Sequence, residues 1–234
     1  MFNRNLNLNE IDNTNRELFS QLFPSLLDTP GCVIIFGHYR SGTTALTSFI
    51  ELIKQVENFG ELLEEDHPYG DRDQIKAMEL LKNNNFFVFN VKPRYYYRLP
   101  NCFLNNSIPN YKIKLNRENI IDQLTSLCVQ VMDDRVGFDP RYPKPDYSLH
   151  INLDTIRRCI YSYLDFQDVH NNTTIKFDAE VTYDEIKPLL QYSNIKTAWR
   201  PQNYNEIYET VNNEYILAIN RISRLNKWIN QLGC

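Results

Sequence analysis

Long apolar runs are absent from this sequence of 234 residues. A membrane-spanning helix needs about 18 or more consecutive apolar residues, and no stretch approaches that length, so we expect no membrane span. The opening segment, MFNRNLNLNEIDN, contains no apolar core, so it does not read as a secretory signal. Both absences favour a protein of the cytoplasm.

Closely spaced cysteine pairs are also missing. The five cysteines are odd in number and scattered, without C-x-x-C spacing, which argues against a zinc site and against a disulfide framework. We therefore expect reduced thiols, as in a cytoplasmic protein, and no metal centre. These cysteines are Cys32, Cys102, Cys128, Cys159 and Cys234.

No excess of positive charge is present. Lys and Arg number 25 against 29 Asp and Glu, giving a net charge of -4, which argues against a general nucleic-acid or membrane-surface binder. Apolar residues make up 42% of the chain, enough for a buried core. We expect a polar lead segment with one short helix over 1–30, followed by a single domain over 31–234.

Apolar runs with the character of buried strands alternate with segments of helical periodicity. This alternation predicts an α/β fold with a mostly parallel sheet flanked by helices. Strands are expected at 32–36, 85–91, 111–116 and 173–177, with a loop over 92–100. Helices are expected at 17–27, after the loop that follows the first strand, and at 118–132, 151–166 and 206–232.

The stretch GHYRSGTTAL, residues 37–46, joins the first strand to a helix and has the glycine spacing of a phosphate-binding loop. A helix N-terminus offers unpaired N–H groups to an anion. Gly42 permits close approach, and the donors expected around one phosphate are those of Arg40, Ser41, Thr43 and Thr44. A glycine turn capped by threonine is the alternative interpretation.

The usual lysine after the second glycine is replaced by Thr43, and the nearest cation is Arg40. The segment HYRSGTT resembles the 5′-phosphosulfate loop, [PH]-x-[KR]-S-G-T-[TS], of sulfotransferases that use 3′-phosphoadenosine 5′-phosphosulfate (PAPS). The resemblance implies a P-loop-like fold in which Arg40 contacts the 5′-phosphate and the transferring sulfuryl group. Gly42, Thr43 and Thr44 would then cradle the 5′-phosphate.

A second segment, KIKLNRENIIDQLTSL, resembles the 3′-phosphate motif of the same family, in its bacterial carbohydrate-type and nodulation-type branch. The resemblance implies that Arg117, after a strand, and Ser126, nine residues later on a helix, bind the 3′-phosphate. Helical periodicity places Ser126 on the face of Asn119 and Asp122, away from the apolar stripe. A solvated serine and a surface arginine are the alternative.

Two groups are candidates for catalysis. Glu61, after Gly60, is similar in position to the family's general base, and Lys92 ends a buried strand, where ligands of open α/β sheets bind. Each has a plainer alternative, as a solvated acid and as a surface lysine. Glu64 and His67 are the fallback bases.

Other features fit the resemblance less closely. The run Tyr95 to Tyr97 can line a sugar-binding surface or pack in the core. Phe177-Asp178 replaces the Tyr-Glu that ends a late strand in the family. Lys196 and Arg200 are candidates for the basic loop over the 3′-phosphate, and residues 133–148 form a plausible lid.

These features predict transfer of the sulfuryl group from PAPS to a hydroxyl of a carbohydrate, glycolipid or small molecule, leaving 3′-phosphoadenosine 5′-phosphate (PAP). No metal, nucleic acid or membrane span enters this prediction. One rival is a P-loop-type nucleotide or small-molecule kinase, which would depend on magnesium. The other is a catalytically inactive nucleotide-binding interaction module.

Overall fold

The computed structural model of the chain divides into two compact units, each described by itself. The first comprises Met1–Glu118 and Val169–Lys196, and the second comprises Asn119–Asp168 and Thr197–Cys234. The residues that the structure describes are 11–63, 70–133, 147–193 and 200–232. None of the helices within these ranges combines the length and apolarity needed to cross a membrane.

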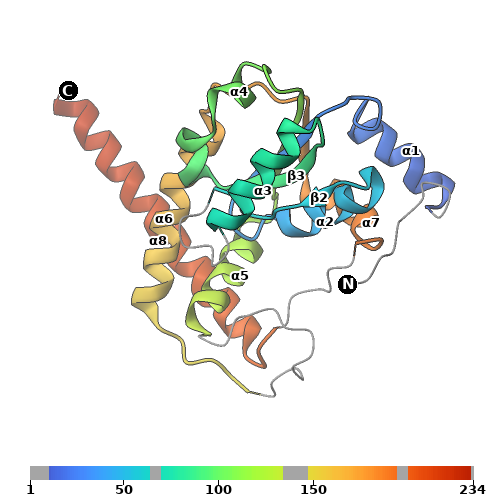
Figure 1. Cartoon of the computed structure of the whole chain (residues 1–234). Helices are drawn as coiled ribbons and strands as arrows, with labels where there is room; N and C mark the ends of the chain where they lie inside the picture. Colours follow the sequence, from blue (N-terminus) through green and yellow to red (C-terminus); the bar gives the residue numbers. More distant parts are fainter. Residues whose placement is uncertain (1–10, 64–69, 134–146, 194–199, 233–234) are drawn as a thin grey trace. The chain divides into compact units, whose positions relative to one another are not determined.

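The first unit contains a sheet of five parallel strands in the order β2-β3-β1-β4-β5. Helices flank this sheet, so the α/β fold class predicted from the sequence is confirmed (Figure 1). The strands are β1 (Cys32–Gly37), β2 (Glu57–Asn58), β3 (Phe87–Val91), β4 (Asn110–Asn116) and β5 (Ala179–Thr182).

Both faces of the central strand β1 are covered, which explains why CVIIF is apolar at every position. Val33 and Ile35 belong to a buried cluster with side chains of three helices: α1 (Asn13–Leu22), α2 (Thr43–Lys54) and α7 (Tyr183–Leu190). On the opposite face, Ile34 and Phe36 belong to a second cluster. That cluster includes residues of α3 (Gly70–Lys82), the 3₁₀ helix η2 (Pro93–Arg98) and α4 (Asn101–Leu104).

The strand order creates a topological switch point between β1 and β4. From β1 the chain passes through α2 towards β2, on one side of the sheet, whereas from β4 it continues to β5 on the other side. In open parallel sheets, ligands bind in the crevice at the carboxyl ends of two such strands. The segments after Gly37 and Asn116 border this crevice, and both carry residues predicted to bind phosphate.

The second unit is helical within the described residues. It contains α5 (Ile120–Met132), most of α6 (Leu153–Asn171) and α8 (Tyr204–Leu232). Their apolar faces meet in a buried cluster that includes Leu124, Ile160 and Ile207. The last three residues of α6, from Val169, belong to the first unit.

The strand predicted at 173–177 is wrong, because the strand begins later, at Ala179. The hydroxyl of Thr173 accepts the N–H of Ile175, and such a local bond competes with strand pairing. Asp178 then joins β4 from outside the strand: its N–H donates to the carbonyl of Lys112, and its carboxylate accepts the N–H of Lys112 at 2.7 Å.

Other boundaries also differ from the sequence-based prediction. The first helix is α1, with Asp12 as its N-cap, and it ends at Leu22 rather than at residue 27. Pro24 explains this, because the residue before a proline is driven out of the helical region, as Phe23 is. The predicted loop over 92–100 contains η2, and β2 and α3 were not predicted.

Candidate functional site

The loop after β1 turns back tightly over the end of its own strand. A Cβ added to Gly37 would lie 2.5 Å from Cγ2 of Thr43 and 2.8 Å from Oγ of Ser41, so only glycine fits there. The carbonyl of His38 accepts both the N–H of Ser41, at 3.2 Å, and its hydroxyl, at 2.7 Å. These contacts fix the loop against the strand that carries it.

Two further residues of the loop have left-handed backbone conformations. Gly42, the N-cap of α2, has φ of 96°, and a Cβ there would lie 2.5 Å from Cδ2 of Tyr183. Arg40 has φ of 61°, which is uncommon for a residue other than glycine and costs roughly 1–3 kcal/mol. The chain therefore turns into the first N–H groups of α2, where an anion is stabilised by the helix dipole.

Lys92 contacts both Glu61, the other predicted catalytic group, and the phosphate-binding loop. Its side chain is 3% exposed, and its ammonium lies 3.0 Å from a carboxylate oxygen of Glu61, whose side chain is 28% exposed. It also donates to Oγ1 of Thr43 at 2.5 Å. The plainer interpretation of Lys92, as a surface lysine, is therefore wrong: the ammonium is buried and points at the start of α2.

Arg117 reaches the loop from the neighbouring strand β4. Its Nη1 donates to the carbonyl of Arg40 at 2.7 Å, and its guanidinium lies over the ring of Tyr183 at 4.9 Å. The same ring stands against Gly42. The segments that follow β1 and β4 are thus in direct contact, and the binding roles of Arg40 and Arg117 stay predictions.

Ser126 and Arg200 belong to the second unit. Ser126 is half-buried on α5, and Arg200 is exposed, pairing with Asp122 at 3.3 Å and lying over the ring of Tyr204 at 4.3 Å. Their predicted contact with a 3′-phosphate stays a prediction. Glu64, His67, Lys196 and most of the predicted lid, at 134–146, lie outside the described residues.

The tyrosine run divides between core and surface. Tyr95 and Tyr96 are buried, whereas the side chain of Tyr97 is 77% exposed. Three tyrosines therefore do not line one sugar-binding surface. Tyr39 is a neighbour of the site that the sequence did not reveal: the ammonium of Lys92 and the guanidinium of Arg94 lie 5.5 and 5.6 Å from its ring.

A buried polar network links the end of α6 to η2 and to the end of β4. His170, near the end of α6, is 1% exposed; its Nδ1 is 2.5 Å from the hydroxyl of Tyr96 and its Nε2 is 2.9 Å from Oδ1 of Asn116. Burial, with smaller effects from Lys114 and His38, lowers the pKa of His170 to about 4. His170 is therefore neutral at pH 7, donating from Nε2 and accepting the hydroxyl of Tyr96.

The arrangement around the loop suits an anionic ligand. Cationic side chains come from the segments after three adjacent strands, and the donors at the N-terminus of α2 lie beside them. Within the described ranges, His, Cys, Asp and Glu side chains form no cluster of three able to hold a metal ion. Cys32, Cys102, Cys128 and Cys159 are free thiols.

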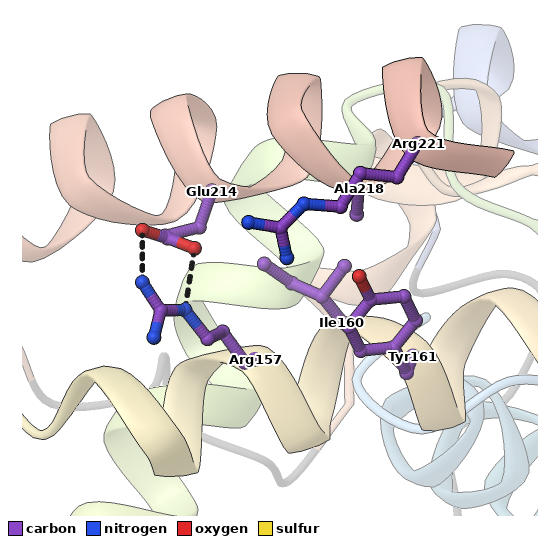
Figure 2. A pocket seen from close by; sticks show the side chains of 6 residues that line it. All are labelled: Arg157, Ile160, Tyr161, Glu214, Ala218 and Arg221. Carbon is purple, nitrogen blue, oxygen red and sulfur yellow. Dashed lines mark hydrogen bonds and ion pairs between the residues drawn. The ribbon is translucent and has the colours of Figure 1, made fainter. Parts of the chain in front are cut away.

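A surface pocket of the second unit contains none of the predicted site residues. It lies between α6 and α8, where Arg157 donates to both carboxylate oxygens of Glu214, at 2.8 and 3.1 Å (Figure 2). The hydrogen bond from Arg157 lowers the pKa of Glu214, with a smaller effect from Arg221. The guanidinium is thus engaged by a carboxylate, as in a structural ion pair between helices.

No protein-family model matches this chain, and no curated protein matches it. The case for a function therefore depends on the geometry of the loop and its neighbours.

Gly42→Ala tests the turn into α2. Besides the backbone strain of a positive φ, the new Cβ meets the ring of Tyr183, so we expect the free energy of unfolding to fall by more than about 2 kcal/mol. Gly60→Ala is the matched control, because Gly60 also has positive φ but a Cβ there meets nothing within 4 Å. Urea unfolding of both variants makes the comparison.

Adding Tyr183→Ala should restore part of the stability lost in Gly42→Ala, since it removes the atoms that the Cβ meets. Equal losses in the two glycine variants, without recovery in the double variant, would contradict the close approach of Tyr183 to the loop.

His170 should make stability depend on pH. The pKa of His170 is about 4 in the folded chain and 6.5 in the unfolded chain. Its contribution to the free energy of unfolding is therefore complete above pH 6.5 and is lost as the pH falls towards 4. The full effect is roughly 3 kcal/mol. Chemical unfolding at several pH values should therefore show a shallower slope for His170→Gln than for the unmodified chain.

His150→Gln is the control for this slope, because His150 is exposed. It should keep the pH dependence of the unmodified chain. If stability changed with pH equally in His170→Gln, His150→Gln and the unmodified chain, a neutral, buried His170 would be refuted.

Proposed function

We propose that this chain is a sulfotransferase that moves the sulfuryl group of PAPS to a hydroxyl of an acceptor. The observation that carries the proposal is the bond from Arg117 to the carbonyl of Arg40 across the switch point of the sheet. It joins the two segments that resemble the family's 5′-phosphosulfate and 3′-phosphate motifs.

The loop supplies the binding of the donor. The N–H groups of Thr43 and Thr44 and the guanidinium of Arg40 would hold the 5′-phosphate, with Gly42 allowing its close approach. The hydroxyl of Ser41 donates to the carbonyl of His38 and would act by fixing the loop. Arg117, in the first unit, would hold the 3′-phosphate. Each hydrogen bond to a charged group is worth roughly 1.5–3 kcal/mol, so these contacts give selectivity for a 3′-phosphorylated nucleotide.

In the transfer step, the acceptor oxygen forms a bond to sulfur while the bond from sulfur to the 5′-phosphate oxygen breaks. The leaving electron pair stays on the phosphate of PAP, and the proton of the acceptor hydroxyl goes to Glu61. Arg40 and Lys92 stabilise the negative charge that develops on the sulfuryl and phosphate oxygens. All atoms and charges are accounted for without a further reactant.

Glu61 suits the role of base because it is held beside the loop while more than a quarter of its side chain reaches solvent. Its partner Lys92 keeps the carboxylate oriented and contacts Thr43, so base and phosphate site are fixed to each other. We assign the acceptor to the carbohydrates, glycolipids or small metabolites, and the reaction to the cytoplasm.

A phosphoryl-transfer function is the second candidate. The ammonium of Lys92 bonded to Thr43 enters the loop from β3, and there it can replace the lysine that phosphate loops of ATP-dependent kinases carry in the loop itself. Such an enzyme would bind ATP with magnesium and would have no use for a 3′-phosphate.

A calorimetric titration separates the two candidates. We expect the full chain to bind PAP without magnesium and to bind 5′-AMP, which lacks only the 3′-phosphate, more weakly. Arg117→Ala should weaken binding of PAP by roughly 10–100-fold and binding of 5′-AMP by much less, because the charged contact to the 3′-phosphate is lost in addition to the bond that supports the loop. Arg158→Ala removes an exposed arginine of the second unit and serves as control.

Preference for ATP with magnesium would replace the sulfotransferase by the kinase. Binding of none of these nucleotides would favour an interaction module without catalysis. A loss of PAP and 5′-AMP binding in equal measure on Arg117→Ala would remove Arg117 from the 3′-phosphate site.

Glu61→Gln tests the base. The amide keeps the shape of the side chain but does not take a proton, so turnover with labelled PAPS and a panel of hydroxyl acceptors should fall by about 10²–10⁴-fold. Affinity for PAP should stay within a few-fold of the unmodified chain. Unchanged turnover in this variant would rule out Glu61 as the base.

A further inference from the structure

Cationic and aromatic side chains alternate in a continuous row that begins at the candidate catalytic lysine. Every neighbouring pair in the row is a cation–π contact, and the row crosses from the phosphate loop to η2. In order, its members are Lys92, Tyr39, Arg94, Tyr95, Arg98 and Tyr97, which we call the ladder.

The contacts along the ladder are regular. Tyr39 lies between Lys92 and Arg94, at 5.5 and 5.6 Å from its ring centre. Tyr95 lies between the two arginines, at 4.4 Å from Arg94 and 5.4 Å from Arg98. Arg98 closes the row over Tyr97 at 5.5 Å and also donates from Nε to its hydroxyl at 3.0 Å.

The two ends of the ladder differ in exposure, and Tyr95 within it is buried. Lys92 is 2% exposed, Arg94 and Arg98 are partly exposed, and Tyr97 is 77% exposed. A route of three positive charges therefore runs from the loop to solvent, on a chain whose net charge is -4. The exposed ring of Tyr97 at the outer end offers an apolar face beside a guanidinium.

The ladder also orders its arginines in advance. A guanidinium stacked on an aromatic ring has lost most of its rotamer freedom, and its planar fork of N–H donors has the geometry that meets a carboxylate. Each arginine already gives one donor to a tyrosine hydroxyl of the ladder, Arg94 to Tyr95 and Arg98 to Tyr97. Binding of an anion then costs little further ordering. Tyr95 and Tyr96 anchor η2 in the core, whereas Tyr97 is mostly exposed and adds little to that packing.

We propose that the ladder is the acceptor subsite and that it selects an acidic carbohydrate, with carboxylates against Arg94 and Arg98 and a sugar face on Tyr97. This inference rests on the proposed function, because it places the acceptor hydroxyl near Lys92 and Glu61. The guanidinium groups would favour acidic ligands over neutral ones, and the exposed ring would favour ligands with a sugar face that can pack on it.

The test is binding of two tetrasaccharides to the full chain saturated with PAP. A hyaluronan tetrasaccharide carries glucuronate carboxylates, whereas chitotetraose is neutral, and both contain N-acetylglucosamine. We expect the acidic probe to bind at least about tenfold more tightly, as charge-assisted bonds require. Arg98→Ala should reduce its affinity to that of the neutral probe, and Arg158→Ala should change neither.

Tyr97→Ala gives a second, independent result. Because Tyr97 is mostly exposed, its loss leaves the core intact, and it should weaken both tetrasaccharides by a similar factor. Equal affinity for the two probes, or the same effect from Arg98→Ala and Arg158→Ala, would overturn the ladder as an acidic-sugar subsite. The proposal would also be overturned if the chain bound phosphatidylglycerol vesicles, lost that binding on Arg98→Ala, and bound neither tetrasaccharide.

The outcomes also separate the subsite from the proposed reaction. Tetrasaccharide binding that depends on Arg98, in a chain that binds no PAP, would keep the ladder as a site for acidic sugars and refute the sulfotransferase. Binding of PAP with neither tetrasaccharide bound would refute the ladder and keep the donor site.

Discussion

The geometry of the site depends on one buried ammonium. Lys92 is almost fully enclosed, and a cation in such a place is stable only when paired and hydrogen-bonded. Its partners, Glu61 and Thr43, come from the segment after β2 and from the start of α2. One charge therefore ties together the ends of two strands and the first turn of a helix. Truncating Glu61 to a side chain without an acceptor oxygen would leave the buried charge without compensation, so the position of Lys92 depends on an acceptor at that site.

A second constraint is the presence, near the site, of backbone conformations and a buried side chain that are unfavourable for folding. Arg40 has a left-handed conformation, Gly42 is closed in by Tyr183, and the amide of Asn90 is buried on β3 with no hydrogen-bond partner in the described part of the chain. The conformation of Arg40 and the unpaired amide of Asn90 each lower stability by roughly 1–3 kcal/mol, whereas glycine adopts its positive φ without that strain. They gather at the carboxyl end of β1 and along β3, next to Lys92. Such a concentration is expected where ligand binding, rather than stability, decides which residues are present.

The parts of the fold that the sequence predicted are those determined by local pattern. The first strand, its loop and helix α2 follow from CVIIF, the two glycines and helical periodicity, which act within about 25 residues. The end of α1 was misplaced although Pro24 marks it. The late strand was misplaced because Thr173 makes a local bond that periodicity does not reveal. The bond of His170 to Tyr96 joins residues 74 positions apart, and no local pattern carries such information.

Several cationic side chains of the first unit are held by different kinds of partner, and this fixed placement affects how they can stabilise charge. Lys92 is fixed by an ion pair, Arg117 by a carbonyl and the face of Tyr183, and Arg94 by two aromatic rings. Catalysis of group transfer between oxygen atoms needs positive groups already in place before charge develops, because reorienting them during reaction costs free energy. A site built from side chains with fixed partners meets that need better than one built from free surface lysines. The same argument favours an anionic ligand at both ends of the site: a phosphorylated nucleotide in the loop and an acidic group along the ladder.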